Sequence, residues 1–239
     1  MPAVWGAGVV HGSREAPGVV LERLRSLTGE PDPSRVIVHG DLTGNVHLDG
    51  AGVPVVLDLS PYLRPARWSE AIVLAELAVR YADRGVVSFG LANDEVLGAP
   101  EAFAPAYDII RGAGLLSTPH AGELCGPESV RGALDALGAD RLQHGVRAVE
   151  DPALLARLAE ERVCCDVCPS SNVLLSVSPD PAGHQLVAML EAGVPCSLNA
   201  DDPLLFGPGL LEEYEVCRSE MGLSDDQLAT IARASVGHS

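Results

Sequence analysis

Aromatic residues, basic residues and long apolar runs are all scarce in this chain. Only 4% of its 239 residues are aromatic, and Lys and Arg total 16 against 33 Asp and Glu, which gives a formal net charge of −17. This charge argues against binding to nucleic acid, because phosphate contacts need an excess of Lys and Arg. No apolar run reaches the roughly 18–20 residues that span a bilayer. We therefore expect neither a nucleic-acid partner nor a membrane.

Signals for secretion or for a cysteine-based metal site are lacking as well. The N-terminus has no basic segment followed by a long apolar core, so no signal peptide is expected, and the sequence predicts a cytoplasmic protein. Cys165 and Cys168 form one C-x-x-C among six cysteines, but a structural zinc site needs four ligands. We interpret the cysteines as buried, reduced thiols.

Apolar residues are abundant, at 47% of the chain, and their pattern predicts an α/β fold. A helix is expected at Trp68–Tyr81, and strand-like and helical runs alternate from Gly85 onward, with further helices expected at 102–113, 128–137, 152–160, 185–192, 210–221 and 225–234. This alternation implies parallel strands joined by right-handed crossovers. The expected strands, about five, span 85–90, 115–120, 141–145, 163–168 and 195–199. Because a closed barrel needs eight, the prediction is a partial TIM (β/α) barrel.

Four short polar segments stand where predicted strands end. In a (β/α) barrel these strand ends meet at one mouth, where the active site lies. Imidazole and carboxylate are common zinc donors, so His120 and Asp201 are candidate ligands. Glu123 could then protonate a bound substrate, His144 could orient a water molecule, and Asp202 could accept a hydrogen bond. The four segments are 118–123, 143–145, 168–172 and 199–203.

Each segment also has a purely structural interpretation. A histidine at a strand end is most often structural, Asp202 before Pro203 could cap the next helix, and residues 168–172 could form a turn of small polar residues. Each of these interpretations stays open when its segment is considered alone. Four such segments in this order, all at strand ends, are not well explained as independent structural features.

Together, the segments closely resemble the adenosine deaminase family, from about Ala75 to the C-terminus. The run Thr118-Pro-His120-Ala-Gly122-Glu123 is similar to the family's His-Ala-Gly-Glu motif. The resemblance implies that His120 is a zinc ligand, that Glu123 is the proton donor and that Gly122 contacts substrate. It also implies zinc-dependent hydrolytic deamination of adenosine or a related 6-aminopurine, giving inosine and ammonia.

The other segments extend the resemblance. His144 matches the family's water-orienting histidine, and Asn199-Ala-Asp201-Asp202-Pro203 looks like its last-strand motif. The resemblance makes Asp201 a zinc ligand and Asp202 a catalytic residue that also contacts substrate. The run from Gly90 to Glu95 resembles a substrate-contacting strand end, in which Asn93 stands where the family usually has Gly.

The family's first strand carries His-x-His, which completes the zinc site. Residues 46–50 read Val-His-Leu-Asp-Gly, but Asn45 occupies the place of the first histidine. About 40 residues separate Asn45 from Gly85, too few for two further strand–helix units of about 30 residues each. We interpret this match as coincidence. With two of the usual ligands, we expect weak zinc affinity.

Residues 10–74 resemble a fragment of an aminoglycoside-phosphotransferase-like kinase. His39-Gly40-Asp41 is followed by Asn45, and Asp58 ends a strand-like run. The resemblance implies a base at Asp41 and Mg²⁺ ligands at Asn45 and Asp58. The nucleotide-binding lobe is absent. We therefore expect a small α+β kinase-like segment over residues 1–74, with a two-stranded hairpin as the alternative, before a barrel domain over 75–239.

Two other functions stay open at this point. The chain could be a catalytically inactive fusion or remnant that acts at most as a binding module, or a phosphotransferase remnant. A small purine nucleoside is the expected partner, and whether the chain forms a homo-oligomer is undetermined.

Overall fold

A computed structural model describes residues 46–48, 54–56, 62–63, 68–93 and 95–236 of the chain. Its main feature is a six-stranded sheet in which every pair of neighbours is parallel and the strands follow chain order. This order is the one that successive βαβ crossovers produce, and it matches part of a (β/α) barrel. The strands are β3 Tyr62–Leu63, β4 Ser88–Asn93, β5 Leu116–Ala121, β6 Arg141–His144, β7 Cys164–Val167 and β8 Cys196–Leu198.

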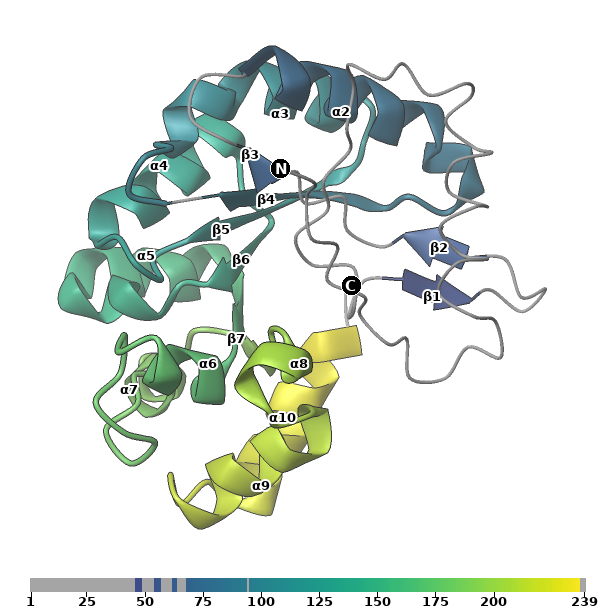
Figure 1. The fold of residues 1–239 in the computed structure, drawn as a ribbon. Coiled ribbons are helices and arrows are strands. Elements are labelled where there is room, and N and C mark those ends of the chain that lie inside the picture. Colours follow the sequence, from purple (N-terminus) through teal and green to yellow (C-terminus); the bar gives the residue numbers. More distant parts are fainter. Residues whose placement is uncertain (1–45, 49–53, 57–61, 64–67, 94, 237–239) are drawn as a thin grey trace, which may run out of the picture.

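Helices cover one face of this sheet, as Figure 1 shows for α2 to α5. One apolar cluster joins α2 and α3 to β4, and a second joins the later helices to β5–β8. Three short 3-10 segments also occur: η1 Ala82–Arg84 lies between α2 and β4, η2 Pro100–Phe103 precedes α3, and η3 Val146–Glu150 precedes α5. The helices are α2 Trp68–Arg80, α3 Ala104–Gly112, α4 Pro127–Leu137, α5 Pro152–Glu161, α6 Pro169–Leu174, α7 Leu186–Glu191, α8 Pro203–Phe206, α9 Leu210–Ser219 and α10 Asp225–Val236.

Two of the expected elements are shifted in the structure. The strand predicted at 85–90 lies at Ser88–Asn93, because Gly85, which follows η1, has a φ of 100° and the chain is still turning there. The single helix predicted from residue 102 is divided into η2 and α3, with Pro105 in the first turn of α3. Proline lacks the N–H that a helix interior needs, so it starts a helix instead of continuing one.

Two further differences concern short elements. Residues 169–174 form the helix α6, where a polar turn had been one interpretation. The sheet also gains a sixth strand, β3, whose two residues pair with Ala92 and Asn93. A two-residue strand is too short to show any periodicity, so no apolar pattern predicts it.

Before this sheet, β1 (Val46–Leu48) pairs antiparallel with β2 (Pro54–Val56) in a separate two-stranded sheet. The kinase-like residues Asp41, Asn45 and Asp58 lie outside the described residues. Within the described ranges, no helix is long and apolar enough to cross a membrane.

The face of the sheet opposite to the helices carries a buried ion pair. The Arg141 side chain on β6 contacts both carboxylate oxygens of Asp166 on β7, with an Nε–Oδ2 distance of 3.1 Å. Ser197 on β8 and Gln143 on β6 also donate to Asp166. The third guanidinium nitrogen of Arg141, Nη1, donates to the Ala234 carbonyl oxygen in α10. This network links three neighbouring strands and ties the last helix to them.

The Asp166→Asn substitution should lower the free energy of unfolding by about 3–5 kcal/mol, because it leaves the Arg141 charge buried without its partner. Chemical denaturation would measure the loss. Asp135→Asn is a matched control, since Asp135 pairs with Arg157 at the surface, where an ion pair contributes less than about 1 kcal/mol. Similar losses in both variants would contradict the importance of the buried network.

Candidate active site

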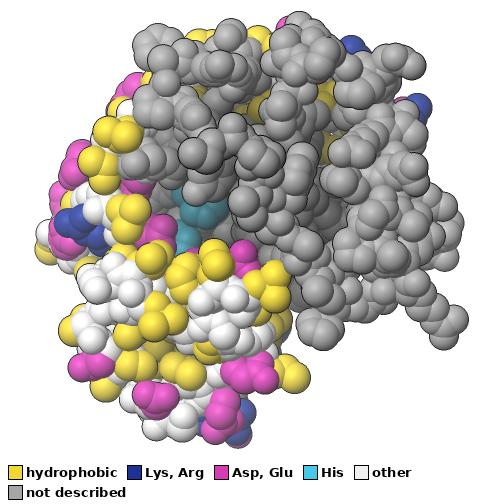
Figure 2. Space-filling model, viewed as in Figure 1, with side chains coloured by type: hydrophobic (Ala, Val, Ile, Leu, Met, Phe, Trp, Pro, Cys, Tyr) yellow, Lys and Arg dark blue, Asp and Glu magenta, His cyan; other side chains and the backbone are white. Residues whose placement is uncertain are grey.

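Polar side chains gather where β5, β6, β7 and β8 end. His120 lies near the end of β5, His144 ends β6, Cys168 follows β7, and Asp201 follows β8 by three residues. Figure 2 shows histidine and acidic side chains together in a hollow of the surface, with hydrophobic side chains at its rim. The carboxyl ends of parallel strands share one edge, which explains why residues far apart in sequence meet here.

The His120 ring is held by the neighbouring strand. Its Nδ1 lies 2.9 Å from the Leu91 carbonyl oxygen on β4. A carbonyl can only accept a hydrogen bond, so the His120 proton sits on Nδ1. The lone pair of the neutral ring is then on Nε2, which makes Nε2 the atom that would ligate a metal. Metal-binding histidines commonly donate their other ring N–H to a carbonyl in this way.

His144 and Asp201 both have backbone conformations that non-glycine residues rarely adopt. Their φ angles are 65° and 47°, in the left-handed region, which costs about 1–2 kcal/mol for an L-residue. The rings of His120 and His144 have centroids 5.3 Å apart. Strained residues cluster at functional sites, where the surroundings impose the conformation. Two such residues beside one another mark these strand ends as the candidate site.

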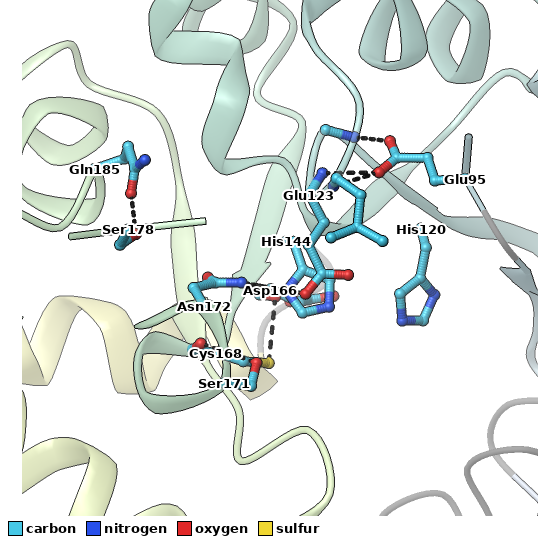
Figure 3. A network of polar contacts seen from close by, with 12 residues as sticks. Glu95, His120, Glu123, His144, Asp166, Cys168, Ser171, Asn172, Ser178 and Gln185 are labelled. Carbon is cyan, nitrogen blue, oxygen red and sulfur yellow. Dashed lines mark hydrogen bonds and ion pairs between the residues drawn. The ribbon is translucent and has the colours of Figure 1, made fainter. Parts of the chain in front are cut away.

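Glu123 lies on the turn after β5, with Oε1 3.4 Å from His144 Nδ1. Burial raises the pKa of Glu123 to about 7, while the nearby His120 acts against this rise and Asp201 adds to it. A carboxyl group with such a pKa is partly protonated near neutral pH, as a general acid must be. Figure 3 shows its carboxyl group beside His144.

The Glu95 carboxylate braces the turn that carries Glu123. It is buried and accepts five hydrogen bonds. Oε1 accepts from Gly122 N and Ser129 Oγ, both at 2.5 Å. Oε2 accepts from the backbone N–H groups of residues 123, 124 and 125 at 2.6–3.2 Å. Four consecutive N–H groups thus converge on one side chain, and the turn takes its shape from it. Figure 3 shows the Glu95 carboxylate beside this turn.

Asn172 and His184 lie behind His144. Asn172 Nδ2 is 3.1 Å from His144 Nδ1 and 3.3 Å from Glu123 Oε1. Asn172 Oδ1 is 3.3 Å from His184 Nε2. The backbone N–H of Leu186, the first residue of α7, donates to His184 Nδ1 at 3.0 Å. This chain of contacts joins α6 and α7 to the two side chains at the candidate site.

The donor set at these strand ends suits a zinc ion. In the described part of the chain, one ligand atom each from His144, Cys168 and Asp201 lie within 4.8 Å of one another, and His120 presents Nε2 nearby. Imidazole nitrogen and carboxylate oxygen are normal zinc donors. Burial raises the pKa of the Cys168 thiol well above its ordinary value, which disfavours the thiolate that a metal binds.

The structure accounts differently for the remaining predicted residues. Gly122 has a φ of 71°, and a Cβ there would collide with Val130, so the turn requires glycine. Asp202 Oδ1 accepts from Leu204 N at 2.9 Å and caps α8, as its structural interpretation proposed. The side chain of Asn93 lies outside the described ones. The substrate contacts of Gly122, Asn93 and Asp202 stay predictions.

Glu95, Asn172 and His184 received no role from the sequence. Glu95 and Asn172 end segments that had been singled out, but nothing in the residue order says that their side chains point back at the neighbouring strand. His184 lies in an irregular stretch before α7. Its proximity to Asn172 arises from how α6 and α7 pack, which no local pattern reports.

Comparison with known proteins gives consistent results. Residues 51–239 match the model of the family described as Adenosine deaminase. A putative adenosine/adenine deaminase of Streptomyces coelicolor is 50% identical over 204 residues, which cover 85% of this chain and 59% of that protein. The chain therefore spans little more than half the length of such relatives.

Solved structures agree on the fold. An adenine deaminase from Arthrobacter aurescens is 32% identical with a TM-score of 0.67, covering 72% of this chain and 52% of its own. An amidohydrolase from Burkholderia ambifaria with bound zinc is 29% identical with a TM-score of 0.68, covering 74% and 50%. These likenesses support a partial (β/α) barrel. None of these findings supports the kinase-like interpretation of residues 10–74.

The Glu95→Gln substitution should destabilise the turn at residues 122–125. The NH2 group of glutamine would replace one carboxylate oxygen and would face at least two N–H or O–H groups that also need an acceptor. The free energy of unfolding should therefore fall by about 3 kcal/mol. Hydrogen exchange of these amides should accelerate more than exchange elsewhere. Glu128→Gln is the control, because Glu128 accepts one backbone hydrogen bond in the same loop. Unchanged exchange in Glu95→Gln would refute the brace.

Glu123 should also make stability depend on pH. Its folded pKa of about 7 exceeds its ordinary 4.5, so its contribution is fully present below pH 4.5 and is lost as pH rises through 7. The loss approaches about 3 kcal/mol, since one pKa unit corresponds to about 1.4 kcal/mol. Denaturant titrations with a chelator, from pH 4.5 to 8, should show Glu123→Gln losing less stability than wild type. Parallel stability curves for wild type and Glu123→Gln would contradict this prediction. Glu160→Gln is the control for loss of a carboxylate, because Glu160 is exposed on α5.

Proposed function

We propose that this chain, which belongs to the adenosine deaminase family, carries out zinc-dependent hydrolytic deamination of a 6-aminopurine. The observation that carries the proposal is the grouping at one sheet edge of a buried carboxyl group with a pKa of about 7 and two imidazoles. An acid that is protonated near neutral pH, beside groups that can hold a metal and orient water, matches the needs of hydrolysis at a ring carbon.

His120 and Asp201 are the residues that would hold the zinc. Two observations support this choice: the Leu91 carbonyl orients the His120 ring, and a ligand atom of Asp201 lies within 4.8 Å of one of His144, the neighbour of His120 in the site. When bound, zinc would lower the pKa of a water molecule, so that a nucleophile is available near neutral pH. The zinc reported for the Burkholderia ambifaria relative supports this choice of metal.

The other residues divide the proton transfers. Hydrolysis adds the water oxygen to C6 of the purine and breaks the C6–N bond. The water loses two protons: one would pass to the leaving amine, which departs as ammonia, and the other would replace the proton that Glu123 gives to the ring. Glu123, partly protonated near pH 7, would donate its proton to the adjacent ring nitrogen as water adds, which neutralises the charge that develops there. His144 would orient the attacking water, and Asp202 would accept a hydrogen bond from it.

The substrate class rests on the relatives, a putative adenosine/adenine deaminase and an adenine deaminase. Both substrates carry an amino group on C6 of a purine. We propose this shared feature as the recognised one and let the assay distinguish adenine from the nucleoside.

Purified, zinc-loaded protein should convert adenosine or adenine to the 6-oxopurine, followed by ultraviolet absorbance and by ammonia release. Glu123→Gln should lower kcat by about 10²–10⁴-fold, because the amide cannot supply a proton. Glu160→Gln should retain full turnover. Absence of turnover in folded, zinc-loaded protein would overturn the proposal and favour an inactive binding module, and so would unchanged turnover in Glu123→Gln.

A further inference from the structure

The two histidines of the candidate site have opposite partners on the same ring atom. His120 Nδ1 faces a carbonyl oxygen, whereas His144 Nδ1 faces the amide nitrogen of Asn172. The rings lie side by side, with centroids 5.3 Å apart. The tautomer of each ring decides whether Nε2 is a lone pair or an N–H donor. These tautomers can be worked out from the contacts, starting at a group whose proton cannot move.

That group is the backbone N–H of Leu186, which can only donate. Its partner, His184 Nδ1 at 3.0 Å, must therefore be an acceptor. A neutral imidazole that accepts at Nδ1 carries its proton on Nε2. Burial lowers the pKa of His184 to about 4, so the ring is neutral at physiological pH. His184 Nε2–H therefore donates to whatever lies opposite it.

The atom opposite is an oxygen of Asn172, 3.3 Å away. Because His184 donates, this atom must be the carbonyl oxygen of the amide and not its nitrogen. Asn172 is fully buried, and the bond to His184 removes the usual ambiguity between the two ends of an amide. The other end, Nδ2, then points at His144 Nδ1 and Glu123 Oε1 and donates to both.

His144 Nδ1 is thereby required to accept, and the proton of the neutral His144 ring lies on Nε2. His120 has the reverse arrangement, with its proton on Nδ1. Figure 3 shows the Asn172 side chain reaching toward His144, while the His120 ring stands apart from this contact.

We propose that Asn172 and His184 are positioning residues that hold His144 as an Nε2–H donor, and so assign the neighbouring imidazoles different tasks. His120 supplies a ring lone pair to the metal, and His144 supplies an N–H to the attacking water. The tautomers follow from the hydrogen-bond contacts and do not depend on the proposed function, whereas the tasks rest on it. A protonated Nε2 cannot ligate, so the relay also keeps His144 out of the metal shell despite its closeness to Cys168 and Asp201.

The first test reads the tautomers directly, without any activity. Two-dimensional ¹H–¹⁵N spectra of protein labelled on its histidine rings, recorded with a chelator at pH 8, separate Nδ1–H from Nε2–H rings. The peaks are assigned by single substitution. Wild type should show His144 and His184 as Nε2–H and His120 as Nδ1–H. A His144 ring that carries its proton on Nδ1 would overturn the proposal.

Asn172→Asp is the decisive variant, because it keeps the shape of the side chain and replaces the donor by an acceptor. The His144 proton should move to Nδ1, and kcat should fall by about 10- to 100-fold, as for other residues that orient a site through a second side chain. KM should change little. An unchanged tautomer in a folded variant would refute the relay.

His184 offers a matched pair of variants. His184→Phe removes the donor and should leave His144 in a mixture of tautomers, while His184→Gln retains an N–H donor and should restore most of the wild-type tautomer and turnover. Ser178→Ala is the control, since Ser178 is buried in the same segment and bonds to Gln185, outside the relay. Equal effects of Phe and Gln, or an effect of Ser178→Ala on the tautomer, would assign the change to packing and overturn the proposal.

The two proposals fail separately. The assigned tautomers together with no turnover in zinc-loaded wild type would overturn the deaminase function and leave the relay standing. Turnover together with an Nδ1–H tautomer at His144 would overturn the relay and leave the function standing.

Discussion

The position of every side chain in the candidate site depends on one constraint, the parallel pairing of strands in chain order. Parallel strands place all their carboxyl ends on one edge of the sheet, so His120, His144 and Asp201 meet although the sequence separates them widely. The ion pair between Arg141 and Asp166 holds β6 and β7 together from the inner face. Apolar packing against the helices holds the other face. The site inherits its geometry from this framework.

Glu95 and Glu123 are neighbouring carboxyl groups whose different surroundings give them different roles. Glu95 accepts five hydrogen bonds, four of them from consecutive backbone N–H groups, and its role is to shape a turn. Glu123, on that same turn, accepts a hydrogen bond from Asn172, and burial raises its pKa to about 7. Desolvation with few donors produces an acid that holds its proton near neutral pH. The turn that Glu95 holds in place thus carries the Glu123 carboxyl group, which has few hydrogen-bond donors of its own.

The imidazoles of His120 and His144 likewise differ because of their surroundings. A carbonyl opposite His120 Nδ1 and an amide N–H opposite His144 Nδ1 give chemically identical rings different protons to offer. The difference originates in a backbone N–H at the start of α7, which is not itself part of the site. The packing of α6 and α7 on the strand ends therefore affects the chemistry. It places a backbone N–H, which can only donate, in contact with histidine rings and an amide whose donor and acceptor atoms are otherwise interchangeable.

Much of the framework was predictable from the sequence. Alternation of apolar runs predicted five of the six parallel strands and most helix starts. It could do so because the buried apolar residues of a strand or a helix recur at a regular spacing that is visible in a single sequence. The misplaced strand at 85–90 and the divided helix after residue 99 both arise at local turns, around Gly85 and Pro105, where backbone conformation outweighs apolar pattern. The strand β3 was missed because two residues form no pattern.

By itself, the sequence determined the residue types of the site and their order along the chain: His120 and Glu123 after one strand, His144 after the next, and Asp201 after the last. It did so because short-range spacing and strand ends are local properties. Only the tertiary structure decided which groups face which atoms: Glu95 beneath the turn, Asn172 behind His144, His184 behind Asn172. Hydrogen-bond direction, burial and pKa depend on neighbours brought together by packing across many residues, and no local pattern in the chain encodes them.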